Sequence, residues 1–377
     1  MSERYIGSWM QDGAFNPLVA PTPSYQAYLY SWGFNSYGQL GLGNTTTYRS
    51  PKQVGSSSNW AKVSVGKYTS SFAIKTDGTL WSWGWGISGQ LGQGNTTKYS
   101  SPKQVGSLSN WNNIASGQFF AVATKTDSTI WSWGGNGQGQ LGIGNTNSYY
   151  SPVQIGALTN WLQVAAGYYN TAAIKTNGTL WTWGLNNFGQ LGLGNTTYYS
   201  SPKQVGSLTN WSSITCGYNH SLAIKTDGTL WSWGYNNAGQ LGLNNQTNYS
   251  SPKQVGALNN WASASAGQAF SIAVKKDGTI WSWGNSSYGA LGQGSSPYSS
   301  PKQIGALTNW LTVSCGQYTA GAIKTDGTLW MWGVNTQGQL GIGNTTTYSS
   351  PIQIGASTTW YGMATGAYNG NTLGLLL

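Results

Sequence analysis

The stretch from Asn210 to Gly242, NWSSITCGYNHSLAIKTDGTLWSWGYNNAGQLG, is one copy of a unit that the chain of 377 residues repeats seven times. Its last tryptophan recurs at spacings of 51, 50, 50, 50, 50 and 49 residues, at Trp32, Trp83, Trp133, Trp183, Trp233, Trp283 and Trp332. A period near fifty residues, rich in turn glycines and strand-forming residues, is typical of β-propellers and not of helical solenoids.

Each copy of the unit predicts four β-strands. In residues 229–234, TLWSWG, the side chains alternate between two faces, and residues 221–226, SLAIKT, form a second strand. The Asp-Gly dipeptide between them is a strong hairpin signal. NWSSIT forms a third strand, and PKQVG forms a short outer strand entered through a proline, which suits a sheet edge. The leucine of the linking GQLG segment (Leu191, Leu241) is predicted to fill the space between blades.

The seventh copy is split between the two ends of the chain. Residues 27–41, AYLYSWGFNSYGQLG, begin in the middle of a repeat, and residues 360–377, WYGMATGAYNGNTLGLLL, stop in the middle of one. An open solenoid needs polar caps and not complementary ends. The halves therefore predict an all-β, seven-bladed propeller of four-stranded antiparallel blades over residues 25–377, closed by a blade that both termini share.

Residues 1–24 lie outside the repeat and are expected to form an extended arm. Prolines at 17, 21 and 23 oppose both helix and sheet ladder. The arm either packs on its own propeller or docks on a neighbouring subunit. Its apolar residues are the candidate docking residues: Tyr5, Ile6, Trp9 and Phe15.

Charged residues make up only 6% of the chain, and its net charge is +10. One set of lysines ends the motif AIK or its variants ATK and AVK, at Lys75, Lys125, Lys175, Lys225, Lys275 and Lys324. The second set follows SP, at Lys52, Lys103, Lys203, Lys253 and Lys302. In a ring, such positions become circles of charge. One interpretation is that these lysines provide solubility and protect strand edges. The alternative is that the second set forms a ring that binds an anionic partner weakly. No specific nucleic-acid binding is expected.

The polar inventory predicts no catalytic, metal or cofactor site. Beyond the arm, every carboxylate is the aspartate of the hairpin turn, at Asp77, Asp127, Asp227, Asp277 and Asp326. His220 is the single histidine, so neither a catalytic triad nor a histidine-based metal site can form. Cys216 and Cys315 share a position that carries Val, Ser, Ala or Thr in the other copies, which predicts buried free thiols. Of 22 tryptophans, only Trp9 and Trp85 stand outside the repeated positions, so the others are interpreted as blade core.

The pattern GxxHSLAIKTDGTLWSWGxNxxGQLGLG resembles the regulator-of-chromosome-condensation repeat family over residues 25–377. The resemblance implies a seven-bladed propeller whose ring is closed by both termini. The family's best-known member is a nucleotide-exchange factor for a small GTPase on chromatin, and it uses a protruding insertion for this. Here no repeat exceeds 51 residues, and the family histidine remains only at His220. The near-identical repeats look similar to propellers encoded by bacteria and their viruses.

These features lead to the prediction of a non-enzymatic structural or recognition subunit of a larger particle. The expected role is that of a bacteriophage virion component, such as a tail, fibre, neck or capsid-surface protein. Its expected partners are other subunits of the particle, docked through the arm and the blade loops, and a host surface ligand. Two alternatives stay open: a cytosolic regulatory propeller that binds a small GTPase or nucleic acid, and a stand-alone surface lectin or adhesin. The sequence has no signal peptide or spanning segment, which predicts synthesis in a host cytoplasm, incorporation into the virion and no membrane insertion.

Overall fold

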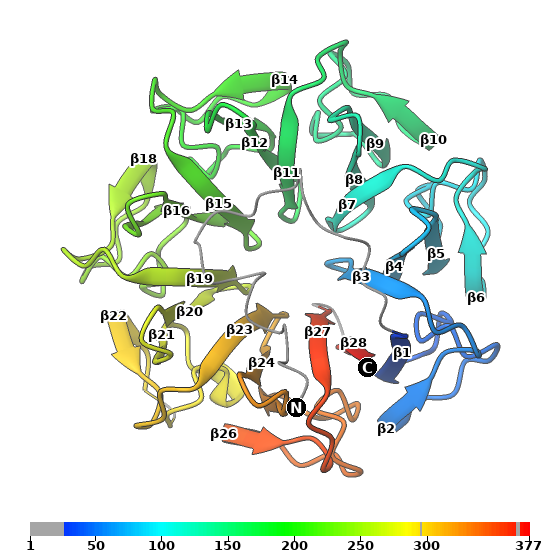
Figure 1. Cartoon of the computed structure of the whole chain (residues 1–377). Helices are drawn as coiled ribbons and strands as arrows, with labels where there is room; N and C mark the ends of the chain where they lie inside the picture. The colour runs from blue at the N-terminus through cyan, green and yellow to red at the C-terminus, as the bar shows by residue number, and fades with distance from the viewer. Residues whose placement is uncertain (1–25, 295, 367–369) are drawn as a thin grey trace, which may run out of the picture.

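The computed structural model describes residues 26–294, 296–366 and 370–377. They form seven four-stranded antiparallel sheets arranged as blades around an axis (Figure 1), as the repeat predicted. We name the blades A to G. Blade A has the order β2-β1-β28-β27, and blades B to G follow in chain order from β3-β4-β5-β6 to β23-β24-β25-β26.

The strands fall into four equivalent sets. The first strand of each blade contacts the first strand of both neighbouring blades, so these seven surround the axis. They are β3 (Trp60–Val65), β7 (Trp111–Ser116), β11 (Trp161–Ala166), β15 (Trp211–Cys216), β19 (Trp261–Ala266), β23 (Trp310–Cys315) and β27 (Trp360–Thr365). The second strands are β4 (Ser70–Lys75), β8 (Phe120–Lys125), β12 (Asn170–Lys175), β16 (His220–Lys225), β20 (Phe270–Lys275), β24 (Thr319–Lys324) and β28 (Asn371–Leu376).

The two remaining sets lie farther from the axis. The third strands are β5 (Leu80–Gly84), β9 (Ile130–Gly134), β13 (Leu180–Gly184), β17 (Leu230–Gly234), β21 (Ile280–Gly284), β25 (Leu329–Gly333) and β1 (Tyr28–Gly33). The outermost strands are β6 (Tyr99–Gln104), β10 (Tyr149–Gln154), β14 (Tyr199–Gln204), β18 (Tyr249–Gln254), β22 (Tyr298–Gln303), β26 (Tyr348–Gln353) and β2 (Tyr48–Gln53). A 3₁₀ turn, η1 (Ser287–Gly289), lies in blade F.

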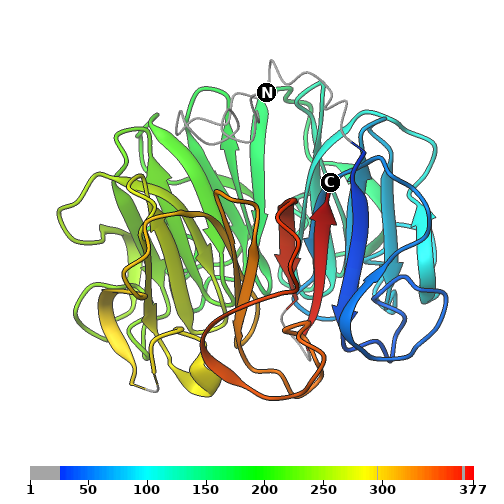
Figure 2. The same cartoon turned by 60° about the horizontal axis from the view of Figure 1, so that its bottom comes forward.

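Blade A closes the ring with strands from both ends of the chain. Strand β1 pairs antiparallel with β28, from Tyr28 opposite Leu376 to Gly33 opposite Asn371. On its other side β28 pairs with β27, and Figure 2 shows β28 lying between β1 and β27. The predicted shared blade is therefore confirmed.

The strand directions give the disc two distinct faces. The turn face carries the hairpins between second and third strands and the loops that lead from one blade to the next. The loop face carries the turns between first and second strands, and the longer loops between third and outermost strands. Strand β1 begins and β28 ends at the turn face, where Ala27 donates its backbone N–H to the Ser58 carbonyl.

The tryptophans fill the spaces between blades, as predicted. The seven on the third strands are fully buried, and each indole Nε1 donates to a backbone carbonyl of the preceding blade, as Trp233 does to Gln190 at 2.9 Å. The tryptophans that open the first strands pack edge-on against them, as in Trp211 and Trp233, whose ring centroids lie 6.1 Å apart. Leu191 and Leu241 are also fully buried.

One hairpin carries serine in place of the turn glycine, which yields a stability prediction. Ser128 has φ +61°, in the left-handed region that the other copies give to glycine, for example Gly228 at φ +81°. We expect Ser128→Gly to raise the free energy of unfolding by about 1 kcal/mol because glycine adopts this region without strain. Urea midpoints would measure the change. The reciprocal Gly228→Ser should destabilise, and a destabilised Ser128→Gly variant would contradict the argument.

Candidate functional site

The predicted arm residues Tyr5, Ile6, Trp9 and Phe15 lie outside the residues that the structure describes. The second lysine set is exposed on the outermost strands, so it follows the circumference of the disc in five of seven blades. Each ammonium lies 4.2–5.7 Å from the centroid of a tyrosine ring on the same strand. These residues are Lys52, Lys103, Lys203, Lys253 and Lys302.

The first lysine set does not form a circle of exposed charge, contrary to the expectation from the sequence. Lys225 is 7% exposed, and its Nζ lies 5.0 Å and 3.7 Å from the centroids of Trp211 and Trp231. The same sandwich forms in blades B to G. Burial lowers the pKa of Lys225. In blade A, Leu376 takes the lysine's place opposite Trp360, and Tyr30 packs edge-on against that ring.

The hairpin aspartates have a structural role. Asp227 Oδ1 accepts hydrogen bonds from the backbone N–H of Thr229 at 2.9 Å and from its hydroxyl at 2.7 Å. The same hydroxyl accepts from Trp231 Nε1 at 2.8 Å. These bonds hold the pKa of Asp227 below its ordinary value. Within the described ranges, no three His, Cys, Asp or Glu residues are grouped in a way that could hold a metal.

The histidine and the thiols are buried inside the blades. His220 is 1% exposed, its Nε2 lies 3.0 Å from Ser271 Oγ, and burial lowers its pKa to about 3. Cys216 and Cys315 end the first strands of blades E and G, so blade F separates them. Burial raises the pKa of Cys216 to about 11 and of Cys315 to about 12, so both thiols are protonated near neutral pH.

An arc of exposed leucines lies on the turn face and was not predicted from the sequence. Five successive loops between blades each expose one leucine by 45–52%: Leu108, Leu158, Leu208, Leu258 and Leu307. The two loops flanking blade A carry Ser57 and Ser357 at this position, so the arc is open where β1 begins. In the sequence, each of these leucines stands three residues before the tryptophan that opens the next first strand, as Leu208 stands before Trp211. The loop backbone turns this side chain outward.

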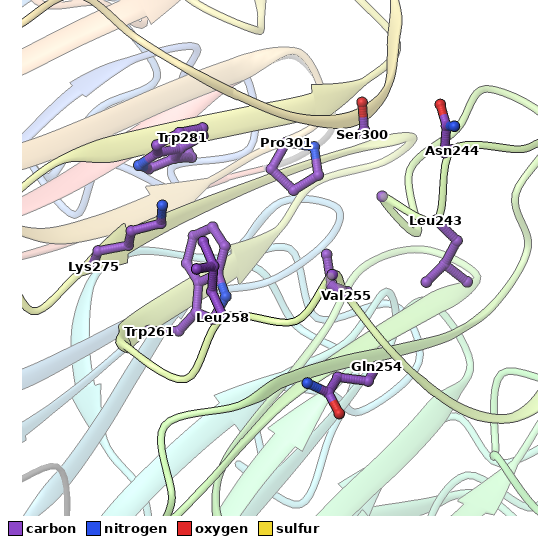
Figure 3. Close-up of a pocket in the computed structure, with 12 residues that line it drawn as sticks. Leu243, Asn244, Gln254, Val255, Leu258, Trp261, Lys275, Trp281, Ser300 and Pro301 are labelled. Carbon is purple, nitrogen blue, oxygen red and sulfur yellow. The ribbon is translucent and has the colours of Figure 1, made fainter.

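A groove between blades E and F adjoins this arc (Figure 3). Its volume is about 340 Å³, and Leu258 lines it together with the sandwich of Trp261, Lys275 and Trp281. Pro301 of the outermost strand β22 lines it as well. The turn face therefore offers apolar surface beside shielded positive charge.

The loop face has a different chemistry. Tyr37 stacks on Trp85 with ring centroids 4.5 Å apart and planes 10° apart, and Tyr68 and Phe119 continue the cluster. Trp85 is thus a surface aromatic residue, in keeping with its place outside the repeated tryptophan positions.

In the described part of the chain, no helix is long and apolar enough to cross a membrane.

The Arabidopsis thaliana ultraviolet-B receptor UVR8 is 37% identical over 83 residues, 22% of this chain and 19% of the receptor. The Caenorhabditis elegans homolog of the X-linked retinitis pigmentosa GTPase regulator is 36% identical over 100 residues, 25% of this chain and 7% of that protein. The matched segments thus span less than a fifth of these relatives.

Solved structures share the fold over nearly the whole chain. Prp20p from Saccharomyces cerevisiae, studied for its binding to Gsp1p and histones, has a TM-score of 0.82 at 18% identity and covers 96% of this chain and 95% of its own. Human WBSCR16 has a TM-score of 0.82 at 20% identity, with coverage of 93% and 98%. At these identities the likeness establishes the fold alone.

The relatives found are eukaryotic, so they do not support the expected bacterial or bacteriophage origin or the virion location. The model of the regulator of chromosome condensation (RCC1) repeat matches seven segments: 27–73, 77–124, 127–174, 177–224, 227–274, 277–323 and 326–369. Together these segments take in most residues of the propeller, including three of the four strands of the shared blade, β1, β2 and β27. The chain belongs to the regulator of chromosome condensation repeat family.

Proposed function

We propose that this chain is a non-catalytic regulatory propeller that binds a folded protein through its turn face. The leucine arc is the observation that carries the proposal. Five leucines at 45–52% exposure, placed on successive blades, present apolar surface that water solvates poorly. The groove beside Leu258 offers a place for a side chain of the partner.

A small GTPase is the partner class we favour. The support is family membership together with a relative named as a GTPase regulator homolog. A virion role has no support from the relatives, which are eukaryotic. The repeats contain no insertion that could act as a wedge against a GTPase, so we propose binding and do not propose nucleotide exchange.

The test of the turn face is the triple variant Leu158→Ser, Leu208→Ser and Leu258→Ser. We expect it to weaken partner binding at least about tenfold, since apolar groups at the centre of an interface dominate its affinity. Its melting temperature should stay near that of the wild type, because exposed substitutions change stability by about 0.5 kcal/mol or less. Binding to purified small GTPases in nucleotide-free, GDP and GTP states would be measured by biolayer interferometry.

The matched control is Ile87→Ser, which removes a 53% exposed apolar residue on the loop face. If Ile87→Ser abolished GTPase binding and the triple variant left it intact, the choice of the turn face would be overturned. If the chain bound no GTPase but still bound another folded protein through its turn face, the partner class would be overturned and the choice of face would stand.

The arm remains a separate proposal, in which residues 1–24 dock the propeller onto an assembly partner. Ring closure does not use them, since β1 begins at Tyr28. We expect deletion of residues 1–22 to leave a folded propeller that no longer joins its complex, with Trp9→Ala giving the largest single effect. Analytical size-exclusion of the complex would show this. Unfolding of the shortened protein would mean that the arm supports the ring, and normal assembly would exclude the arm as a docking element.

A further inference from the structure

Five basic residues of the described chain stand outside the two repeated lysine sets, and four of them belong to two neighbouring blades. Those four are Arg49 of blade A and, in blade B, Lys62, Lys67 and Lys98. The fifth is Lys276, in the hairpin of blade F on the turn face. Trp85, the one described tryptophan outside the repeated positions, also belongs to blade B. Departures from the repeat thus add positive charge and an aromatic ring in the same part of the disc.

Two of these basic residues lie on the rim of the loop face. At the second position of the outermost strand, five blades carry serine, blade A carries Arg49 and blade C carries Tyr150. Lys98 directly precedes the outermost strand of blade B. Arg49 and Lys98 are exposed, and Tyr150 is 45% exposed. Strands β2, β6 and β10 follow one another along the rim (Figure 1), so the three side chains belong to consecutive blades.

An aromatic ladder lies on the loop face of the same three blades. Neighbouring rings in it have centroids 4.5–6.1 Å apart, and all of its members are partly exposed. In order, they are Phe34 and Tyr37 of blade A, Trp85 and Tyr68 of blade B, and Phe119 of blade C. Trp85 is the middle ring, and its stacking on Tyr37 fixes its orientation.

Backbone packing places Lys98 next to the ladder. Gly86, which follows Trp85, packs against the carbonyl group of Thr97, and Thr97 precedes Lys98. The loop that starts at Trp85 therefore returns past it before the outermost strand begins. An exposed ammonium group and the middle of the ladder thus lie on one surface.

Tyr150 and Arg49 extend this surface in the two opposite directions along the rim. The Tyr150 ring packs on Gly89, which belongs to the loop that Trp85 begins. Arg49 packs on Gly338 of blade G, at the other border of blade A. The basic and aromatic residues therefore line an extended surface that crosses the loop face of blades A, B and C.

Negative charge within the described chain is confined to the other face. Every side-chain carboxylate of the described residues belongs to a hairpin of the turn face, and β28 ends the chain at that face as well. The surface on blades A to C is therefore both basic and aromatic. Its complement is an elongated ligand that carries repeated negative charges and flat rings.

We infer that the loop face of blades A to C binds single-stranded nucleic acid. Arg49 and Lys98 contact phosphate groups, and unpaired bases stack on Tyr150 and on the exposed side of the aromatic ladder. Bases inside a duplex are not available for such contacts. Stacking tolerates every base, so no sequence preference is expected. The inference does not depend on the proposed function, because the leucine arc lies on the opposite face.

The experiment measures fluorescence anisotropy of labelled oligothymidylate and oligouridylate of about twelve nucleotides, a length within the range that such surfaces cover. We expect saturable binding of the full chain that weakens as salt rises. The test variant combines Arg49→Ser, Lys98→Thr and Tyr150→Ser, and each change introduces a residue that other blades carry at that position. It should keep its fold and bind at least about tenfold more weakly.

Single variants separate the two kinds of contact. Lys98→Thr should reduce the slope of log affinity against log salt by about 0.7, the value for one phosphate contact with a single strand. Lys276→Thr is the matched control, since it removes an exposed lysine of the turn face where five other blades carry threonine. It should bind as the wild type does. Trp85→Ala should weaken oligonucleotide binding severalfold and leave heparin binding unchanged, because heparin has no bases to stack.

Three results would overturn the inference. The first is the absence of saturable binding to either oligonucleotide. The second is equal weakening by Lys98→Thr and Lys276→Thr, because net charge alone would then attract the ligand. The third is a duplex of the same length that binds as tightly as the single strand, or a Trp85→Ala variant with unchanged affinity, since stacking on unpaired bases would then contribute nothing.

Discussion

Removal of residues Leu373–Leu377 is expected to lower the melting temperature by at least about 10 °C. The deletion takes most of β28, the strand that joins the N-terminal strand β1 to the C-terminal strand β27. Leu373 and Leu375 are 0% and 1% exposed and belong to the core between blades A and B. Truncating one such leucine alone costs about 2–5 kcal/mol, a large share of the 5–15 kcal/mol that keeps a protein folded.

The loss is more than that of two side chains. Without β28, the facing edges of β1 and β27 lose their hydrogen-bond partners, and the ring has a gap. Removal of Leu377 alone is the control. This residue is 37% exposed and follows the strand, so its removal should leave the melting temperature nearly unchanged. A five-residue deletion that melts within about a degree of the intact protein would show that the closure of blade A does not hold the ring together.

The fold was predictable because the local signals recur from blade to blade. Strand alternation, the hairpin dipeptide and the split repeat each indicate the same architecture, and the sheet order confirms it. The role of the tryptophans followed for the same reason. Seven identical positions in a ring contact seven equivalent neighbours, so a wide apolar side chain there belongs between blades.

The surfaces were less predictable, because exposure depends on how each loop leaves its strand. Lys225 and Lys253 look alike in the sequence, yet Lys225 lies between two indoles and Lys253 is exposed on an outer strand. Leu258 was not singled out in the sequence, and its loop turns it to solvent.

Replacement of Trp233 by alanine is the second change with a large expected effect. The side chain is fully buried, packs with Leu180 of blade D and Trp211 of blade E, and donates its Nε1 hydrogen to Gln190. The variant loses the apolar contacts, leaves a cavity and leaves a buried carbonyl with one partner fewer. We expect the free energy of unfolding to fall by about 3–5 kcal/mol, measured by urea denaturation.

Trp85→Ala is the control, because it removes the same side chain from a partly exposed site on the loop face. Its main loss is the stacking on Tyr37, so about 1 kcal/mol is expected. The repeat also supplies internal replicates. Trp83 and Trp133 donate to Gln39 and Gln90 at 2.9 Å, the same distance as in Trp233, so their alanine variants should cost similar amounts. An effect of Trp85→Ala as large as that of Trp233→Ala would mean that the repeated tryptophans are not what holds neighbouring blades together.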